Sequence, residues 1–275
     1  MAYYMHNHFM RTFVVIFMST LTITKNRFLV LATLLVLPVL LFAQADSNKV
    51  DAAGKKQGLW KKYDNEGKLK YQGQFKDDKP EGKFIYYYPD GKVKTISVYS
   101  KNGSVARVKT YDEFYTKLMA EGKYVNEKKD SIWNYYTLDA KQDSEIISVE
   151  AYKNGIKDGM WKTFYPGGKL FDTKIYKNDI LDGPWLQYFE DNTPRTKGTY
   201  VKGQLEGLAT YYGPDGKKVA EGRFVKGVRH GVWFVKNAEG KMVNEKYNMG
   251  QLIGKPKLEK TSKDDGRRPP AKEAE

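Results

Sequence analysis

The residues that could support catalysis are few and far apart in this chain of 275 residues. Cysteine is absent, and His230 is the only histidine after residue 45, because His6 and His8 lie near the start. Nucleophilic catalysis of the Ser-His-Asp or Cys-His type needs a base held beside the nucleophile. Metal-binding motifs that cluster histidines, such as H-E-x-x-H, are also missing. We therefore expect no enzymatic activity, no metal site and no cofactor.

Acidic residues are numerous, and a carboxylate pair across a cleft would be enough for glycoside hydrolysis. Most of them, however, recur at fixed positions: Asp158, Asp182 and Glu206 each precede a recurring glycine, and His230 occupies the same slot. Such positions favour turns, where polar side chains hydrogen-bond to the backbone. We expect these four residues to be structural. The acids that this regularity does not explain are Asp112, Glu113 and Glu121.

A glycine recurs about every 24 residues, and an aromatic residue usually follows it two positions later. The glycines are Gly58, Gly82, Gly159, Gly183, Gly207 and Gly231. The aromatic residues at the second position are Trp60, Phe84, Trp161, Trp185 and Trp233, and Trp133 follows Ser131 in the same way. A fixed period of this length indicates an array of stacked supersecondary units.

Each unit has the pattern of a β-hairpin. The segment from Trp161 to Tyr165 alternates polar and aromatic residues like a strand, and Tyr88-Pro89-Asp90-Gly91 has the composition of a tight turn. The phase predicts about eight units, with a degenerate one near Arg107 and an insertion within residues 139–145. We expect an all-β fold: an elongated, single-layer antiparallel meander of about eight 24-residue hairpins.

The second strands carry a family resemblance. The segments Gly198–Gly207 and Gly222–Gly231 both read G-x-aromatic-x-x-G-x-x-x-G, which resembles the MORN repeat. The following Trp and the Pro-Asp-Gly turns are similar to its bacterial variant, often labelled a YwqK-type antitoxin component. The resemblance covers roughly residues 54–256, although Asp78, Glu127 and Asp179 replace the middle glycine. It implies an elongated, twisted β-ribbon that binds a partner, and it implies no reaction.

A second row of aromatic residues follows the first three positions later. Because side chains alternate along a strand, an odd offset places the two rows on opposite faces of the sheet. The first row is expected to pack, and the second row is our candidate binding face: Tyr63, Tyr87, Tyr136, Phe164, Tyr188 and Tyr212. The irregular segment Thr110–Ala120 could instead form a short capping helix and offer a partner site.

The two ends of the chain differ from the array. Residues 1–45 place Lys25-Asn26-Arg27 before an apolar run that ends at Ala43-Gln44-Ala45, the order of a secretory signal peptide. The true start could be Met18, and a retained single anchor is the alternative. We expect residues 46–53 to be a short linker, residues 54–256 the array, and residues 257–275 a disordered charged tail.

The formal net charge of +14 leaves several partners open. Lysines such as Lys68, Lys92, Lys169 and Lys217 follow turn glycines, where charge keeps an open sheet soluble. An anionic lipid or glycan could also use this charge, whereas nucleic acid suits an exported chain least. The leading hypothesis is a non-catalytic scaffold of the cell envelope, periplasmic or secreted, with a protein partner. An antitoxin-like binder of a toxin and a cell-wall or glycan-binding module are the alternatives.

Overall fold

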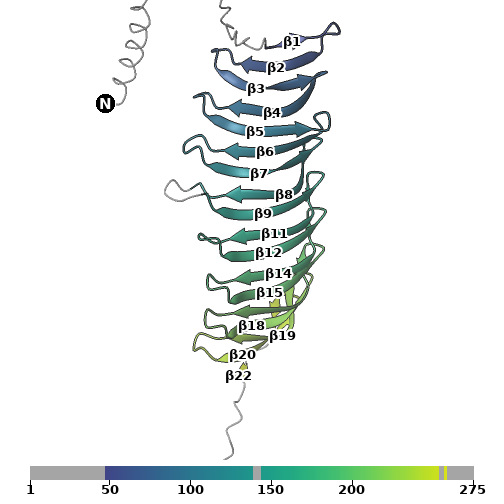
Figure 1. Cartoon of the computed structure of the whole chain (residues 1–275). Helices are drawn as coiled ribbons and strands as arrows, with labels where there is room; N and C mark the ends of the chain where they lie inside the picture. The colour runs from purple at the N-terminus through teal and green to yellow at the C-terminus, as the bar shows by residue number, and fades with distance from the viewer. Residues whose placement is uncertain (1–46, 139–143, 254–256, 259–275) are drawn as a thin grey trace, which may run out of the picture. The chain divides into compact units, whose positions relative to one another are not determined.

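The computed structural model describes residues 47–138, 144–253 and 257–258. The chain divides into one unit of residues 1–44 and another of residues 45–275. The first unit contains most of the expected signal peptide and lies outside the described residues. Within the described residues the regular elements are all β-strands, β1 to β22, joined as one antiparallel sheet (Figure 1). The all-β antiparallel meander expected from the repeat is confirmed.

Eight hairpins, numbered here as repeats one to eight, build the described part of this sheet. Their arms are β2 (Lys56–Tyr63) and β3 (Leu69–Lys76), β4 (Lys79–Tyr87) and β5 (Val93–Ser100), β6 (Val105–Tyr111) and β7 (Leu118–Val125), β8 (Lys128–Tyr136) and β9 (Ile146–Lys153), β11 (Gly159–Phe164) and β12 (Leu170–Lys177), β14 (Gly183–Tyr188) and β15 (Pro194–Val201), β17 (Gly207–Tyr212) and β18 (Lys218–Val225), and β19 (Val228–Lys236) and β20 (Met242–Asn248). Each arm pairs with its neighbours in chain order, so the ribbon is open and elongated.

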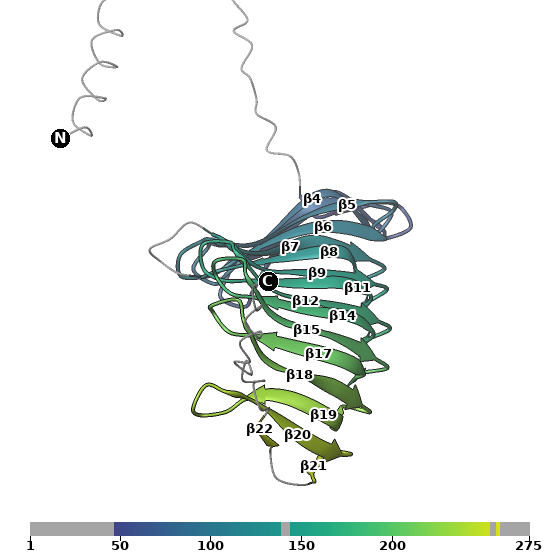
Figure 2. The ribbon, with the colours of Figure 1, turned by 90° about the horizontal axis from the view of Figure 1, so that it is seen from below.

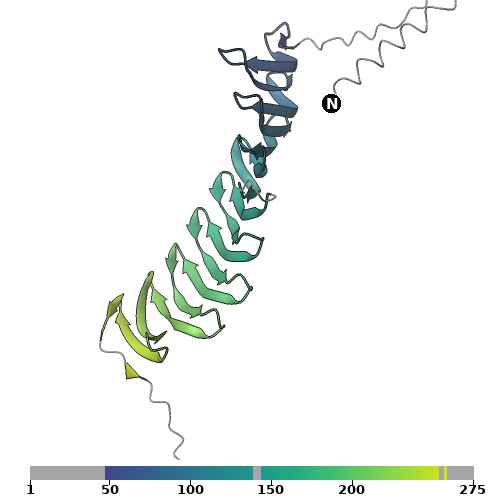
Figure 3. The ribbon, with the colours of Figure 1, turned by 90° about the vertical axis from the view of Figure 1, so that its left-hand side faces the viewer.

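Six two-residue segments complete the described sheet: β1 (Lys49–Val50), β10 (Ile156–Lys157), β13 (Ile180–Leu181), β16 (Gln204–Leu205), β21 (Gln251–Leu252) and β22 (Lys257–Leu258). Figure 3 shows the strands bent into arcs, and Figure 2 shows their direction turning steadily from β4 to β20. A bent single layer has a crowded side and an open side, and this difference decides which residues are buried.

Turns of two kinds alternate along the ribbon. Inside a hairpin, Tyr88 N–H donates to the Lys92 carbonyl at 2.8 Å, and Gly91 has a φ of +86°. Between hairpins, two residues with positive φ form the tight turn whose twist suits antiparallel strands. Asp78, Glu127 and Asp179 occupy this second turn with φ of +66°, +63° and +66°. Replacing the expected glycine therefore leaves the turn geometry intact.

The recurring glycine lies at or near the start of the first strand of a repeat and has a positive φ. Gly58 and Gly231 have φ of +67° and +76°, and Ser131 takes the same slot at +61°. Left-handed backbone costs a non-glycine residue roughly 1–2 kcal/mol, which explains why glycine recurs. Repeat three has no positive φ here, since Ala106 holds the slot and β5 pairs with β6 without a register shift. The glycine slot of the degenerate unit is thus Ala106, next to Arg107, where the phase placed it.

Both ends of the array extend beyond the expected boundaries. β1 lies in the segment assigned to a linker, yet it pairs with β2, and Trp60 Nε1 donates to the Lys49 carbonyl at 3.1 Å. β22 lies in the segment assigned to the charged tail, and it pairs with β20. The rest of that tail, residues 259–275, falls outside the described residues.

The expected helix within Thr110–Ala120 is wrong, because this segment forms the end of β6, the hairpin turn and the start of β7. Asp112 closes the turn: its Oδ1 accepts from the N–H groups of Phe114 and Tyr115 at 3.0 and 2.7 Å, and its Oδ2 accepts from Lys117 N–H at 2.8 Å. Burial alone would raise the pKa of Asp112, but these donors hold it below its usual value. A capped turn therefore satisfies the backbone groups that a helix would have paired.

Candidate functional site

The side chains two residues after each recurring glycine all lie on one face of the sheet, called the inner face here. We call this position the ring slot, because an aromatic ring usually occupies it. The ring lies over a residue of the preceding strand, which we call the seat. A Cβ placed on Gly122 or Gly222 would come within 2.3 and 2.2 Å of the indole rings of Trp133 and Trp233. These tryptophans are 3% and 0% exposed. Glycine in the seat therefore lets the ring pack directly against the backbone.

The seat residue sets how deeply each ring is buried. The strand registers place Glu150 and Lys174 in the seats beside Trp161 and Trp185. Both tryptophans are only half-buried, and Trp185 Nε1 donates to Asp172 Oδ1 at 2.8 Å instead of to a backbone carbonyl. Burial of this aromatic row is thus deepest where the preceding strand supplies glycine.

Another aromatic row, different from the candidate binding residues, also lies on the inner face. Its members pair across the strands with the glycine slot, as Tyr176 pairs with Gly159 and Tyr247 with Gly231. Ring contacts join the rows, with centroids 4.9 Å apart for Tyr124 and Trp133. The row consists of Phe75, Tyr99, Tyr124, Tyr152, Tyr176, Tyr200, Phe224 and Tyr247. Edge-to-face contacts of this kind stabilise beyond the area they bury, so these rings are part of the core.

Basic side chains cover the paired rings at several repeats. The Nζ atoms of Lys56, Lys129 and Lys157 lie 4.9, 4.8 and 4.4 Å from the centroids of their tryptophans, and the Arg229 guanidinium lies 4.4 Å from Trp233. Cations at such distances are attracted to the ring faces. Part of the positive charge of the chain therefore serves packing within these repeats.

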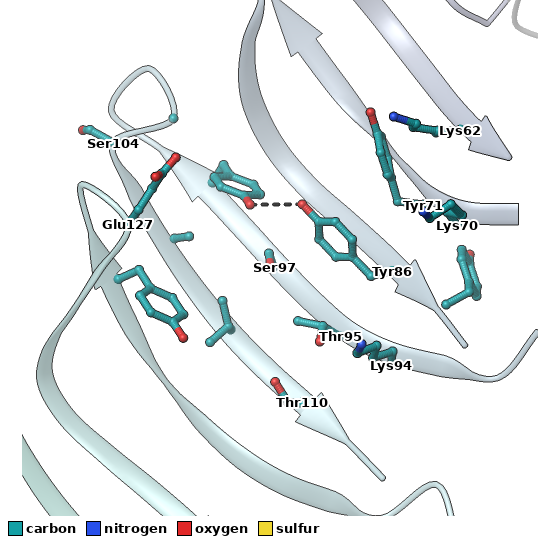
Figure 4. Close-up of a pocket in the computed structure, with 16 residues that line it drawn as sticks. Lys62, Lys70, Tyr71, Tyr86, Lys94, Thr95, Ser97, Ser104, Thr110 and Glu127 are labelled. Atoms are coloured by element: carbon teal, nitrogen blue, oxygen red, sulfur yellow. Dashed lines mark hydrogen bonds between the residues drawn. The ribbon is translucent and has the colours of Figure 1, made fainter. Parts of the chain in front are cut away.

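Repeat three departs from this plan and leaves a hollow of about 720 Å³ on the inner face. Val108 takes the ring slot, and Ser97, which is 3% exposed, takes the seat. The walls of the hollow include Tyr71, Tyr86, Tyr99 and Tyr124 (Figure 4). The hollow exists because Val108 stands where neighbouring repeats have a large ring.

Hydroxyl and ammonium groups line the hollow. The phenol oxygens of Tyr86 and Tyr99 lie 3.1 Å apart, and burial together with this contact raises the pKa of Tyr86. Figure 4 shows Lys62, Lys70 and Lys94 on one side of Tyr86. Within the described residues, Lys62 and Lys70 form no ion pair. Two uncompensated cations thus stand beside an aromatic, hydroxylated wall.

The six candidate binding residues do not form one exposed ladder. Tyr63 is 49% exposed, but Tyr87 accepts a hydrogen bond from Gln72 Nε2 at 2.8 Å and also lines one edge of the hollow. Tyr136 donates to Glu121 at 2.6 Å, and burial with this contact raises the pKa of Tyr136 to about 12. The remaining three, Phe164, Tyr188 and Tyr212, are half-buried.

The face opposite the tryptophans, called the outer face here, exposes a different row that the sequence reasoning overlooked. It consists of the residues immediately before the ring slots of repeats four to eight, called the outer row: Ile132, Met160, Pro184, Leu208 and Val232. Four of them are 50%, 48%, 61% and 49% exposed, with Pro184 also exposed. Their odd offset from the tryptophans was the available signal, because it places them on the outer face.

The polar residues that could have suggested catalysis accept hydrogen bonds from the backbone of the turn that follows their own hairpin. Glu206 Oε2 accepts from Lys226 N–H at 2.9 Å, and His230 Nδ1 accepts from Met249 N–H at 3.3 Å. Asp158 Oδ2 accepts from Asn178 N–H at 3.4 Å. The residues directly before the recurring glycines therefore stabilise turns, as their repeated position predicts.

Two acids outside the repeat phase have structural partners for their carboxylates: Asp112 closes the turn between β6 and β7, and Glu121 accepts from Tyr136 and forms an ion pair with Lys109 at 3.4 Å. Glu113 contributes its backbone carbonyl, which accepts from Lys92 Nζ at 2.9 Å. Among the described residues, no group of three or more His, Cys, Asp or Glu side chains is arranged to hold a metal ion. No helix long and apolar enough to cross a membrane occurs in the same part of the chain.

Family models match several of these hairpins. The MORN repeat variant matches residues 56–77 and 157–178, and the MORN repeat matches residues 71–93, 197–218 and 221–232. The matches fall on the glycine and aromatic positions that shape the inner face. They support a MORN-repeat family for this chain, and such repeats suggest binding or scaffolding.

Comparisons with whole proteins add little. No curated protein matches the sequence. Among solved structures, the crystal structure of TcdB2-TccC3-TEV is 12% identical over 72% of this chain and 13% of that chain, with a TM-score of 0.18. The Photorhabdus luminescens Tc holotoxin pore carrying the TccC3-D651A mutation is 12% identical over 74% and 13%, with a TM-score of 0.17. The chain spans about 13% of the length of these structures.

Proposed function

We propose that this array of MORN-like hairpins is a non-catalytic scaffold, exported to the cell envelope, that binds a protein partner through the outer row. The observation that carries the proposal is the repeated exposure of apolar side chains on the outer face of repeats four to eight. Contiguous exposed apolar surface on a soluble protein commonly marks an interaction site.

The geometry of the outer row suits a partner that lies along the ribbon. Neighbouring strands are about 4.8 Å apart, so equivalent residues of successive hairpins recur about every 10 Å. Arg223 and Lys246 lie directly across the strands from Leu208 and Val232. A partner with apolar groups at this spacing and acidic groups beside them would match the surface. Repetition lets several modest contacts add up to useful affinity.

We propose no enzymatic role because the candidate polar residues already hold structural hydrogen bonds. His230, Glu206 and Asp158 already accept hydrogen bonds from turn backbone, and the out-of-phase acid Glu121 is held by Tyr136 and Lys109. A general base must reach a proton of the substrate. These groups serve the fold, so we assign none of them to a reaction.

Export is supported by the order of basic residues, apolar run and Ala43-Gln44-Ala45 in the sequence. We expect the mature protein to begin at or near Asp46 and to occur outside the cytoplasm. N-terminal sequencing of the native protein is the test. A mature chain that retains residues 18–45 would replace export with membrane anchoring.

Affinity capture from the native envelope fraction tests the binding role. The wild-type chain is compared with Leu208→Ser/Val232→Ser, which removes two members of the outer row. A matched control, Val98→Ser/Ile180→Ser, removes two side chains that are 49% and 50% exposed outside the row. We expect the wild type and the control to retain one stoichiometric protein and the outer-row variant to lose it. Equal retention by both variants would refute the assignment.

A further inference from the structure

We propose that the hollow in repeat three binds an acidic sugar, such as a uronic acid unit of a polyanionic glycan. The site lies on the inner face in repeats one to three, so it differs from the protein-binding outer row in both face and position. The inference therefore goes beyond the proposed function and does not depend on it.

The hollow is a feature of the sequence of repeat three. In repeats two and four, the rings of Phe84 and Trp133 fill the slot and lie over seat glycines. In repeat three, the side chain of Ser97 occupies the seat, where a Cβ would overlap a ring placed as in its neighbours, and the slot holds Val108. The small side chains of Ser97 and Val108 thus form the bottom of the hollow, and the larger side chains of the flanking repeats form its walls.

The walls have the chemistry of a carbohydrate site. Tyr71, Tyr86, Tyr99 and Tyr124 supply aromatic faces and edges, on which the C–H faces of a sugar ring can pack. Their hydroxyl groups, with that of Thr110, supply donors and acceptors for sugar hydroxyls. The volume of about 720 Å³ falls within the roughly 300–1,000 Å³ typical of small-ligand sites.

Charge selects an acidic sugar over a neutral one. Figure 4 shows Lys62, Lys70 and Lys94 on one side of the hollow and Glu127 on the opposite side. Lys94 Nζ lies 5.4 Å from the ring centroid of Tyr88 and forms no ion pair with any residue that the structure describes. A carboxylate placed toward the lysines would gain charge-assisted hydrogen bonds, and sugar hydroxyls could meet the carboxylate of Glu127. A compact phosphate would share the lysines but would leave the tyrosine walls unused.

Calorimetric titration of the purified protein with a tetramer of galacturonic acid tests this assignment. The neutral galactose tetramer and inorganic phosphate are titrated in parallel. Lys62→Gln/Lys70→Gln/Lys94→Gln removes the lysines of the hollow. Lys202→Gln/Lys226→Gln/Lys236→Gln is the control, because it makes the same change in net charge at exposed positions of repeats six to eight. Ser97→Gly/Val108→Trp restores the glycine seat and the ring, and thereby fills the hollow.

We expect the acidic tetramer to bind about tenfold or more tightly than the neutral one, because exposed charge pairs add modest free energies that sum over three lysines. The triple variant of the hollow should lose at least that factor, the control triple should stay within about twofold, and the filled variant should not bind while its unfolding midpoint holds or rises. Absence of binding by the acidic tetramer, equal loss in both triple variants, equal binding of the neutral tetramer, or inorganic phosphate binding as tightly as the acidic tetramer would each overturn the proposal.

Discussion

The seat glycines lead to a prediction that separates ring packing from every other effect of a glycine substitution. A Cβ on Gly222 would lie 2.2, 2.4 and 2.4 Å from three ring atoms of Trp233, whose ring is fully enclosed. A Cβ on Gly198, at the same position of repeat six, would meet Trp185 Cε3 at 3.3 Å and Leu205 at 3.6 Å. Neither glycine has a positive φ, so backbone strain plays no part in the comparison.

The expected costs follow from these distances. Gly222→Ala must displace a packed indole, and overpacking a core costs typically about 1–3 kcal/mol. At Gly198 the half-buried Trp185 ring needs to move only slightly, because the added Cβ lies 3.3 Å from it, and alanine gains roughly 0.5–1 kcal/mol over glycine within a strand. We therefore expect Gly222→Ala to destabilise by about 2 kcal/mol more than Gly198→Ala.

The assay is urea unfolding combined with hydrogen exchange at β18 and β19, because repeat arrays can unfold in parts. A second variant tests the mechanism: Gly222→Ala/Trp233→Val copies the natural pair Ser97 and Val108. Since the alanine has nothing to displace once the ring is gone, the double variant should cost no more than Trp233→Val alone. Equal effects of Gly222→Ala and Gly198→Ala, or additive costs in the double variant, would refute the reasoning.

Other predictions follow from single positions. Ser131→Gly should stabilise repeat four by about 1 kcal/mol in urea unfolding, because Ser131 holds a φ of +61°; a loss of stability would contradict this. Trp233→Ala should cost roughly 3–5 kcal/mol, and Trp185→Ala clearly less, since Trp185 is half-buried; equal costs would argue against the role of the seat. The lowered pKa of Asp112 means that its contribution is present above its ordinary value of 3.8 and is lost as pH falls through the lower folded value. Acid unfolding of Asp112→Asn should therefore lack this part of the pH dependence, and an unchanged profile would count against the capped turn.

The repeat period made the main features of the fold predictable. Glycine at a fixed phase, an aromatic residue two positions later and turn sequences between them specify a hairpin whatever the ligand is. The structural use of His230 was predictable for the same reason, since its sister positions carry Asp158 and Glu206. Departures at Asp78 and Glu127 changed nothing, because short polar or flexible residues can adopt positive φ when the surrounding strands demand it.

The hollow was harder to predict because it depends on cross-strand neighbours. A seat residue lies eleven positions before its ring, as Gly222 does before Trp233, and single-strand patterns do not link the two. The periodic tyrosines Tyr87 and Tyr136 were visible in the sequence. Their hydrogen bonds to Gln72 and Glu121 were not, because they depend on the register between neighbouring strands. The helix expected near Asp112 failed because one carboxylate satisfied three backbone donors.

The central claim, that a partner covers the outer row, can be tested on two methionines of equal exposure. Met160 belongs to the outer row and is 48% exposed, whereas Met249 lies in a turn outside the row and is 49% exposed. Mild peroxide converts exposed methionine to its sulfoxide, and mass spectrometry can follow both residues in the native envelope fraction and in the purified protein. We predict that oxidation of Met160 is several-fold slower in the native fraction than in the purified protein, while that of Met249 is unchanged. Equal rates for Met160 in both preparations, or equal slowing of both residues, would contradict the claim.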